Sequence, residues 1–373
     1  MGRPVERTSD LRFGVIGTGM MGCEHLRNLA ALPGAEVVAI TDPDETSQGW
    51  GVEAAGRPVE VFDDHERMLA ETGLDAVVVA SPNHTHRSVL EPIWETELHL
   101  MIEKPLCTTV AECLEVRVRA EDHPGIVWVG LEYRYMPAIT QLLDRVEGGD
   151  AGRLHMVSIR EHRFPFLAKV GDWNRFNRNT GGTLVEKCCH FFDLMNVVFG
   201  ERPVRVQASG GQDVNHLDER YDGETPDLLD NAFVIVDYPS GGRALLDLCM
   251  FAEGSRWEQE VVVVGDRGKL EAHLPNFMEV SRGRAAELVV GSRGPEWPVK
   301  EHPVAEDPRI GFHGSHHGAS YLELLHFRDA ILTGADPAVT VDDGLWSVAM
   351  GQAAHRSIEE GRSVLLEELL AEG

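Results

Sequence analysis

The chain has 373 residues, of which 43% are hydrophobic and 25% charged, an ordinary composition for a globular protein with room for two hydrophobic cores. Asp and Glu number 61 against 34 Lys and Arg, which gives a formal net charge of −27 at pH 7. A surface this acidic repels nucleic acids and anionic membranes, so we expect no nucleic-acid or membrane partner.

The sequence contains neither a long apolar run nor a recognisable export signal. No apolar run reaches the roughly 20 residues that a membrane-spanning helix needs, and residues 1–7 lack the apolar core of a signal peptide. The cysteines are scattered and show no CxxC spacing, which favours reduced thiols in a cytoplasmic protein. The six cysteines are Cys23, Cys107, Cys113, Cys188, Cys189 and Cys249.

The N-terminal region begins with a glycine pattern that is typical of dinucleotide sites. A strand predicted over residues 12–16 runs into a GxGxxG turn and then a helix, whose free N–H groups would face phosphates. Gly17 allows the tight turn, Gly19 lets the backbone approach a pyrophosphate, and Gly22 allows close packing of the helix on the strand. The predicted cofactor-binding residues of this turn are Gly17, Thr18, Gly19, Met20, Met21 and Gly22.

An acidic residue stands where a dinucleotide site requires one. A second apolar run, residues 37–41, stops at Asp42, twenty residues after Gly22. The Asp42 carboxylate can accept hydrogen bonds from the two hydroxyls of an adenosine ribose, and it would repel a 2′-phosphate. The pattern therefore predicts a site for NAD in preference to NADP.

Strands and helices continue to alternate up to residue 130. The run 75–80 is β-branched and shows no alternation, as expected for a strand buried on both faces of a parallel sheet. Residues 1–131 therefore predict an α/β Rossmann domain with a doubly wound parallel sheet. Its ligand would lie beyond the carboxyl ends of the strands, where residues 81–86 and 103–105 fall. Further strands are predicted over 59–62, 99–103 and 125–130, and helices around 67–70 and over 88–97 and 110–121.

The remaining chain, residues 132–373, predicts an α+β domain for substrate binding and oligomerisation. Longer alternating strands indicate a large, mostly antiparallel open sheet. Such a sheet, with helices on one face, leaves apolar residues on the other face, so we expect a homodimer or homotetramer. The predicted elements are a helix over 138–147, strands over 154–162, 232–238, 244–250, 259–264 and 269–273, loops over 211–230 and 292–312, and helices over 318–333 and 343–360.

Two groups of residues could perform acid–base chemistry. Lys104 follows a predicted strand at the cofactor edge, where partial desolvation would lower the pKa of the lysine; it could equally be an ordinary surface residue. Glu186 and His190 are four residues apart, which places them on one face of a predicted helix and suits a proton shuttle. A buried, satisfied histidine is the alternative. Adjacent residues on a helix point about 100° apart, so we predict no metal at 188–190.

These motifs together resemble the Gfo/Idh/MocA family, named for glucose–fructose oxidoreductase and inositol dehydrogenase. The resemblance covers nearly the whole chain and rests on the ordered set 17–22, Asp42, 81–86, 103–105, 129–137 and 181–193. It implies that Lys104 lies between the nicotinamide and the substrate. It also implies that His190 accepts the proton of the reacting hydroxyl, with Lys104 assisting, and that Glu186 is the family's acid.

Other residues join the expected site on the resemblance or on their chemistry. Asn83 and His86 correspond to residues that line the cofactor and substrate cleft in the family. Aromatic and polar groups near that cleft suit a polyol, whose C–H faces stack on rings while its hydroxyls need partners. The further cofactor-binding residues are Ser81, Asn83, His86, Glu103 and Lys104; the expected substrate-binding residues are Lys104, Arg134, Tyr135, His162, Trp173, Glu186, His190 and His316.

The chain departs from the family pattern inside the acid–histidine motif. Glu186 replaces the usual aspartate and Cys188 the usual glycine, which changes the pocket wall more than the reaction class. We therefore expect an NAD-dependent oxidoreductase acting on a secondary hydroxyl of a sugar, cyclitol or glycoside. Two alternatives stay open: cleavage of a glycoside by transient oxidation and elimination, and a non-catalytic NAD(H)-sensing protein.

Overall fold

The computed structural model describes residues 10–372, which divide into two compact units. Unit 1 contains the chain up to Tyr135 together with Lys169–Asn174 and Pro308–Val348. Unit 2 contains Met136–Ala168, Arg175–Asp307 and the chain from Ala349 onwards. Residues 1–7, which were assessed for a signal peptide, lie outside the described residues.

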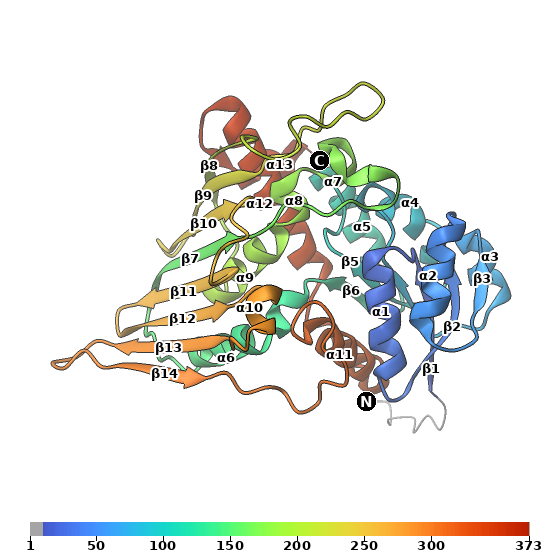
Figure 1. The fold of residues 1–373 in the computed structure, drawn as a ribbon, viewed down its shortest axis with the longest axis horizontal. Helices are drawn as coiled ribbons and strands as arrows, with labels where there is room; N and C mark the ends of the chain where they lie inside the picture. The colour runs from blue at the N-terminus through green and yellow to red at the C-terminus, as the bar shows by residue number, and fades with distance from the viewer. Residues whose placement is uncertain (1–9, 373) are drawn as a thin grey trace. The chain divides into compact units, whose positions relative to one another are not determined.

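Unit 1 is built on a six-stranded parallel sheet of order β3-β2-β1-β4-β5-β6 (Figure 1). Every neighbouring pair is parallel, and all four residues of β4 are buried, as expected for a sheet covered on both faces. The predicted Rossmann sheet is therefore confirmed. The strands are β1 (Leu11–Ile16), β2 (Ala35–Thr41), β3 (Glu60–Phe62), β4 (Ala76–Val79), β5 (His99–Glu103) and β6 (Val127–Gly130).

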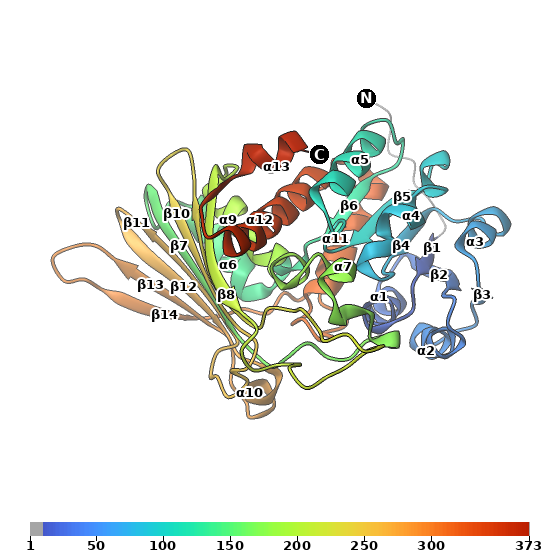
Figure 2. The ribbon, with the colours of Figure 1, turned by 90° about the horizontal axis from the view of Figure 1, so that it is seen from above.

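Helices cover both faces of this sheet. Figure 2 shows α1 (Met20–Ala31) and α2 (Glu45–Ala55) on one side and α4 (His86–Leu90) and α5 (Val110–Glu121) on the other. The helix predicted over 88–97 is wrong: α4 ends at Leu90 and a separate 3-10 turn, η2 (Ile93–Glu95), follows. Pro92 lacks an N–H group and cannot continue the helix. The remaining short elements are α3 (His65–Glu71), η1 (Asn83–Thr85) and η3 (Glu132–Tyr135).

A helix from late in the sequence belongs to unit 1. In α11 (Ala319–Thr333), Arg328 donates a hydrogen bond of 2.5 Å to the Pro33 carbonyl oxygen, which follows α1. The buried Trp128 of β6 donates to Glu323 of α11 at 3.1 Å. The compact units are therefore discontinuous in sequence and differ from the predicted division at 131/132, because α11 packs on the Rossmann elements.

Unit 2 is built on a nine-stranded sheet of order β14-β13-β12-β11-β7-β10-β9-β8-β15. Its pairs are antiparallel except for β7 with β10, which confirms the prediction of a mostly antiparallel sheet. The loop predicted over 292–312 is wrong in part, since it contains β14. The strands are β7 (Leu154–His162), β8 (Arg205–Gly211), β9 (Asn231–Asp237), β10 (Arg243–Cys249), β11 (Gln259–Gly265), β12 (Gly268–Leu274), β13 (Glu287–Ser292), β14 (Val299–Pro303) and β15 (Val364–Leu365).

One face of the unit 2 sheet is covered and the other is open. Along β9 the even-numbered Ala232, Val234 and Val236 are buried, whereas Phe233 is 59% and Ile235 47% exposed. Figure 2 shows α6, α9 and α12 on a single side of the sheet. The helices that contribute to unit 2 are α6 (Pro137–Glu147), α7 (Asn177–Thr180), α8 (Thr183–Glu186), α9 (Cys189–Phe199), α10 (Phe277–Ser281), the end of α12 (Val341–Glu360) and α13 (Leu366–Glu372).

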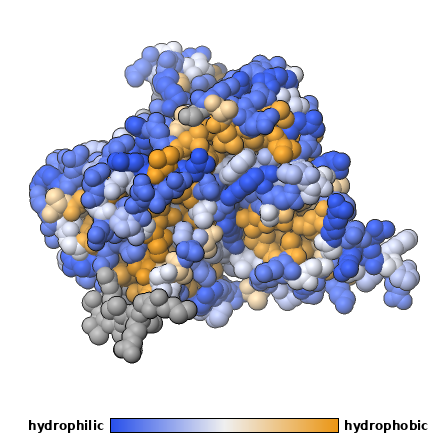
Figure 3. Space-filling view, turned by 180° about the vertical axis from the view of Figure 1, so that it is seen from behind, coloured by the Kyte–Doolittle hydropathy of each residue, from blue (hydrophilic) through white to orange (hydrophobic). Residues whose placement is uncertain are grey.

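Hydrophilic residues cover much of the surface shown in Figure 3, with hydrophobic residues gathered in separate areas. Within residues 10–372, no helix combines the length and apolar character that a membrane crossing requires. The same residues contain no group of three or more His, Cys, Asp or Glu side chains placed to hold a metal ion. All six cysteines carry free thiols.

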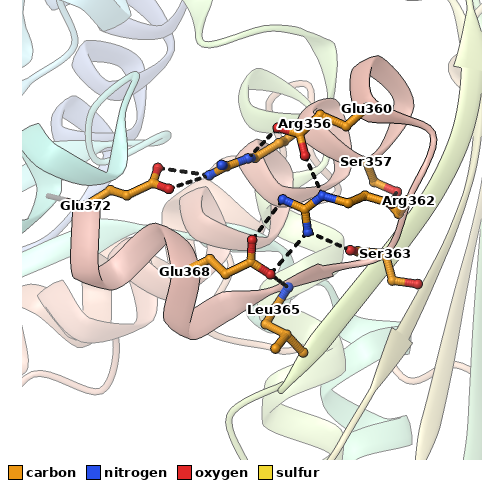
Figure 4. Close-up of polar contacts among 8 residues, drawn as sticks. All are labelled: Arg356, Ser357, Glu360, Arg362, Ser363, Leu365, Glu368 and Glu372. Carbon is orange, nitrogen blue, oxygen red and sulfur yellow. Dashed lines mark hydrogen bonds and ion pairs between the residues drawn. The ribbon is translucent and has the colours of Figure 1, made fainter.

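Two arginines tie the C-terminal helix of unit 2 to the end of α12 (Figure 4). Arg356 contacts Glu372 at 2.8 Å, and Arg362 contacts Glu368 at 2.8 Å. Glu368 also accepts the Leu365 N–H at 3.0 Å. The hydrogen bonds from Arg362 and from the Leu365 N–H lower the pKa of Glu368 to about 2. These contacts hold α13 beside β15, the short strand that closes one edge of the sheet.

A histidine near the end of α12 fixes the start of α8. The Nε2 atom of His355 accepts the Leu184 N–H at 3.1 Å, so the ring must be neutral at this nitrogen. A Cβ atom built at Gly182 would lie only 2.3 Å from the same nitrogen, which shows how closely the ring packs on the glycine. Burial lowers the pKa of His355 from 6.5 to about 4.

We expect this histidine to make stability depend on pH. Between pH 6.5 and 4 the unfolded chain binds a proton at His355 that the folded chain rejects, so the free energy of unfolding falls by at most about 3 kcal/mol as the pH decreases. His355→Gln keeps an acceptor that does not titrate and should lack this part of the decline. Urea unfolding at several pH values measures it; equal pH slopes for the two proteins would contradict the assignment.

Candidate functional site

The three glycines of the N-terminal turn meet different surroundings. Gly17 has φ +88°, and a Cβ atom there would lie 2.7 Å from the backbone of Ala80. A Cβ atom at Gly22 would lie 1.9 Å from the Gly17 carbonyl oxygen. At Gly19, which precedes α1 with φ −71°, a Cβ atom would meet no described atom within 4 Å. Gly17 and Gly22 are therefore needed by the fold, while the space at Gly19 fits a bound pyrophosphate.

Asp42 is fixed at the end of β2 by the glycine turn itself. Its Oδ2 accepts the backbone N–H of Thr18 at 2.7 Å, and its Oδ1 accepts the N–H of Asp44 at 2.9 Å. Thr18 is completely buried, whereas Asp42 is partly exposed. The carboxylate is thus held next to the turn, in keeping with the predicted role toward ribose hydroxyls.

The segment after β4 carries an unsatisfied donor. Asn83 is 6% exposed, and its Nδ2 is buried with no hydrogen-bond partner among residues 10–372. Buried donors are normally paired, so this atom suits an acceptor oxygen of a bound ligand. Nearby, Ser81 accepts a hydrogen bond from Thr85 at 2.8 Å. The residues present fit a dinucleotide at this edge of the sheet.

His86, which was predicted to line the cofactor and substrate cleft, is buried between two loops of the sheet edge. Its ring is completely buried, with Nδ1 3.0 Å from the carbonyl oxygen of Pro105 and Nε2 3.1 Å from that of Ser81. Burial lowers the pKa of His86, although the carbonyl contacts and the charge of Glu103 oppose the shift. The ring therefore lies between the chain after β4 and the chain after β5, with backbone carbonyl oxygens as its polar neighbours.

Glu103, the last residue of β5, turns its carboxylate inward. It is 5% exposed; Oε1 lies 2.5 Å from Nε2 of His25 on α1, and Oε2 accepts the Lys104 N–H at 3.0 Å. Lys104 itself is partly buried, and the Lys104–Pro105 peptide is cis. The sequence analysis missed His25. The only signal for it was a titratable residue in the first turns of the cofactor helix.

Glu132 and Glu323 are further buried acids of unit 1. Glu132 is 3% exposed and accepts a hydrogen bond from Ser320, and the predicted substrate residue His316 lies 3.3 Å from its Oε1. Glu323 is completely buried, and its burial, together with the charges of Glu132 and Glu103, raises its pKa well above the ordinary value. These surroundings favour the protonated form of Glu323. An acidic residue inside the apolar stripe of α11 was its sequence signal.

The other predicted substrate residues of unit 1 have different neighbours. Arg134 contacts Asp343 at 3.2 Å, so its guanidinium serves an ion pair. Tyr135 stacks on His326, with ring centroids 5.2 Å apart. Both are used by packing within the unit. Trp173, in contrast, lies beside His84, with ring centroids 6.0 Å apart, and so joins the segment that follows β4.

In unit 2 the acid–histidine motif is buried but does not form one helix. Glu186 ends α8 with 3% exposure and His190 lies in α9 with 2% exposure. The prediction of a continuous helix is wrong: Lys187 and Cys188 form a turn, and the N–H groups of Phe191 and Phe192 both bond to the Cys188 carbonyl oxygen. The shared helix face therefore no longer follows from the four-residue spacing.

A buried ion pair accompanies this turn. Lys187, 6% exposed, places Nζ 2.9 Å from Oε1 of Glu161 on the covered face of the sheet. The next residue of β7, the predicted substrate residue His162, points to the open face and lies 3.2 Å from Asp247. Successive strand residues point to opposite faces, so the structure does not bring His162 to the motif. Glu161, which no sequence pattern indicated, is the residue of β7 that contacts the motif segment, through Lys187.

Two family models match the chain. The model for the NAD-binding Rossmann fold of the Gfo/Idh/MocA oxidoreductase family matches residues 11–131, and the model for its C-terminal alpha/beta domain matches 144–366. The chain is 29% identical over 363 residues to the myo-inositol 2-dehydrogenase of Thermotoga maritima, covering 96% of this chain and 100% of the relative. It is 23% identical over 386 residues to the 2,7-anhydro-N-acetylneuraminate hydratase of Mediterraneibacter gnavus, covering 97% and 98%.

A solved structure of levoglucosan dehydrogenase, in complex with NADH and levoglucosan, has a TM-score of 0.82 to this chain. Its sequence is 19% identical, and the match covers 96% of this chain and 100% of that chain. At this identity the likeness shows a shared fold.

The different surroundings of the glycines predict different effects of adding one methyl group. Gly19→Ala should melt like the wild type without ligand and lose roughly tenfold or more in NAD affinity, because its Cβ fills space meant for a phosphate. Gly17→Ala should lose roughly 1–3 kcal/mol of stability, since its φ is +88°. Gly49→Ala on α2, in open space, is the matched control. Thermal melts and NAD titrations measure both; unchanged NAD affinity in Gly19→Ala would contradict the cofactor position.

Proposed function

The chain belongs to the Gfo/Idh/MocA oxidoreductase family and has its NAD-binding Rossmann domain, and on this basis we propose that it is an NAD-dependent sugar or polyol dehydrogenase. The reaction transfers hydride between the nicotinamide and a secondary hydroxyl carbon of a sugar, cyclitol or glycoside. NAD supplies the hydride acceptor. The protein binds and orients the cofactor and the substrate, and it accepts the proton. The free thiols favour a cytoplasmic location for it.

The observation that carries this proposal is the position of Lys104, which directly follows β5. Lys104 is partly buried, and its backbone N–H is held by Glu103 at 3.0 Å. A lysine fixed at the carboxyl edge of a Rossmann sheet stands at the edge where such sheets bind their ligands. The related myo-inositol 2-dehydrogenase, by its name, acts on a polyol.

We assign the proton of the reacting hydroxyl to His190 or Lys104. An imidazole can take up a proton near neutral pH, and a partly desolvated lysine can do the same. Glu186 would orient the imidazole or hold a neighbouring hydroxyl of the substrate. The acid is one methylene longer than the family's aspartate, so it affects which polyol is accepted more than which reaction occurs.

Cleavage by transient oxidation is the second candidate. One relative is named a hydratase of an anhydro sugar, a name that does not describe a net oxidation. Oxidising a hydroxyl carbon acidifies the neighbouring C–H bond, which permits elimination of a leaving group before the carbonyl is reduced again. A purely NAD(H)-sensing protein is disfavoured because it leaves Lys104, Glu186 and His190 without a role.

The proposal is tested by mixing the protein with NAD or NADP and a panel of cyclitols, aldoses and aryl glycosides. We expect NADH with one polyol class, and a loss of kcat of roughly 100-fold or more in Lys104→Ala and His190→Ala because each removes a proton acceptor. NAD affinity should stay within about twofold in both. Absorbance of NADH and product analysis measure the reaction.

Lys300→Ala on β14 and the exposed His155→Ala on β7 are the matched controls. Full turnover in a Lys104→Ala/His190→Ala double variant would overturn the assignment. Cleavage of a glycoside without net NADH would move the function to the second candidate, and bound NAD without turnover of any compound would favour the sensing protein.

We further propose that the open face of the unit 2 sheet joins two copies of the chain. Met156 on β7 is 55% exposed, and Ile235 on β9 pairs with Leu245 on β10 at the same face. The charges of this face are paired with one another, as Arg160 contacts Asp247 at 3.0 Å. A face that combines exposed apolar residues with charges paired to one another suits an identical face related by a two-fold axis.

A charge placed on this face should separate the copies. Ile235→Glu should give the mass of a single chain, because two carboxylates would be desolvated at a two-fold contact. Val214→Glu, at an apolar residue that is 54% exposed outside the sheet, should keep the wild-type mass. Light scattering after size-exclusion chromatography measures the mass. A monomeric wild type, or a mass unchanged by Ile235→Glu, would rule the interface out.

A further inference from the structure

Two completely buried histidines hold the backbone on either side of Lys104. His25 reaches the preceding side through Glu103, whose carboxylate contacts the histidine with one oxygen and accepts the Lys104 N–H with the other. His86 reaches the following side, where its Nδ1 lies 3.0 Å from the Pro105 carbonyl oxygen. Both rings come from helices, α1 and α4, that flank the sheet.

We propose that His25 and His86 are positioning residues for Lys104: they fix the peptide groups before and after it, and His25 keeps the Glu103 carboxylate charged next to the lysine. The proposal rests on the proposed function in one respect, that Lys104 takes part in the reaction. Neither histidine would touch the substrate. Each would act through the place and the charge environment that it gives to the lysine.

The His25 side of the arrangement depends on charge. A carboxylate as buried as Glu103 is costly unless it is paired and hydrogen-bonded. Burial alone would raise the pKa of Glu103, but the hydrogen bond and charge of His25 and the charge of Lys104 together lower it. Burial likewise opposes the charged form of His25, and the Glu103 contact more than offsets this and raises the pKa of His25. Glu103 thus stays negative beside the lysine.

Other titratable groups face this pair from the surrounding elements. The charges of Glu24 on α1 and Glu132 in η3 favour protonated His25. The protonated form of Glu323 on α11 is favoured, because burial and the charges of Glu132 and Glu103 raise its pKa. Of the carboxylates named here, Glu103 is the one whose charge acts on Lys104 through a direct backbone contact.

The His86 side depends on geometry. Burial favours the neutral form of His86, which carries one N–H group and can donate at Nδ1 or at Nε2 but not at both. The proposal places this N–H group at Nδ1, where it donates toward Pro105. The Nδ1 atom of the ring faces the carbonyl oxygens of Pro105 and Leu106 at 3.0 and 3.2 Å, and its Nε2 faces that of Ser81 at 3.1 Å. Asparagine places an amide near the Nδ1 position and glutamine one near the Nε2 position. His86→Asn therefore tests the contact to Pro105, next to Lys104, and His86→Gln tests the contact to Ser81.

A histidine at the opposite end of β5 provides the matched control. His123 contacts the Leu98 carbonyl oxygen with its Nε2 at 2.7 Å, just before β5 begins. It makes the same kind of contact to the same part of the sheet, away from Lys104. If the buried histidines only stabilise the fold, then His123→Gln should behave like the variants at His25 and His86.

The composition of the chain allows Lys104 to be observed directly. Reductive methylation with 13C-formaldehyde gives an NMR signal for each lysine, and Lys104→Arg identifies the one from Lys104. The titration midpoint of that signal can be followed without any turnover. The chain has five lysines: Lys104, Lys169, Lys187, Lys269 and Lys300.

We expect the Lys104 midpoint to fall in His25→Leu and in Glu103→Gln, because a negative charge that favours the ammonium form is lost. The value of kcat should fall roughly 10- to 100-fold in His25→Leu, while NAD affinity stays within about twofold. His25→Gln, whose amide can still donate to Glu103, should recover most of both. His86→Asn should retain more activity than His86→Gln, because only the former keeps the contact to Pro105.

Several outcomes would overturn the proposal. One is that the titration midpoint of Lys104 and the value of kcat are the same in His25→Leu and His86→Gln as in the control His123→Gln. Another is loss of NAD affinity in step with kcat, which would show a general defect of the cofactor edge. Glu103→Gln keeps the shape of the side chain and removes its charge, so it tests the charge effect even if His25→Leu fails to fold. Full turnover of Lys104→Arg and Lys104→Ala would instead defeat the proposed function, while the NMR midpoints would still test the positioning.

Discussion

The burial of one carboxylate governs the functional edge of unit 1. Glu103 ends β5 with 5% exposure, so its charge must be met inside the protein. It is met by His25 at 2.5 Å and by the Lys104 N–H at 3.0 Å. One acid therefore links α1, at whose start we propose the cofactor phosphates bind, to the lysine that we propose takes part in the reaction. On the far side of that lysine, Nδ1 of His86 lies 3.0 Å from the Pro105 carbonyl oxygen, the contact that we propose fixes the chain there.

Unit 2 also contains a buried charge that is met by a partner inside the protein. Its sheet has one covered face, and the segment that carries Glu186 and His190 is packed there by a buried ion pair, Lys187 with Glu161 at 2.9 Å. Such a pair is weak support for stability, but it can specify one arrangement over others. Here it accompanies the turn that divides α8 from α9. The neutral ring of His355 fixes the start of the same segment, which ties the geometry of the motif to the protonation of a residue outside it.

Much of the fold could be predicted from the sequence because its signals are local. The glycine turn, the buried β-branched strands and the alternating strands of unit 2 each follow from a spacing that a few neighbouring residues set. The site was harder to predict, because its partners are distant. Glu103 and His25 are 78 residues apart, and no local pattern pairs them. The turn at Lys187, the packing of α11 in unit 1 and the burial of His86 likewise follow from tertiary contacts.

Hydride transfer to the bound dinucleotide is the central claim, and isotope labelling tests it most directly. A polyol that carries deuterium on the carbon of its reacting hydroxyl would be incubated with the protein and NAD, and the NADH formed would be examined by mass spectrometry. The account predicts that the deuterium appears in the nicotinamide ring of NADH, in step with formation of the carbonyl product. Deuterium released to water, or substrate consumed while no labelled NADH accumulates, would contradict it.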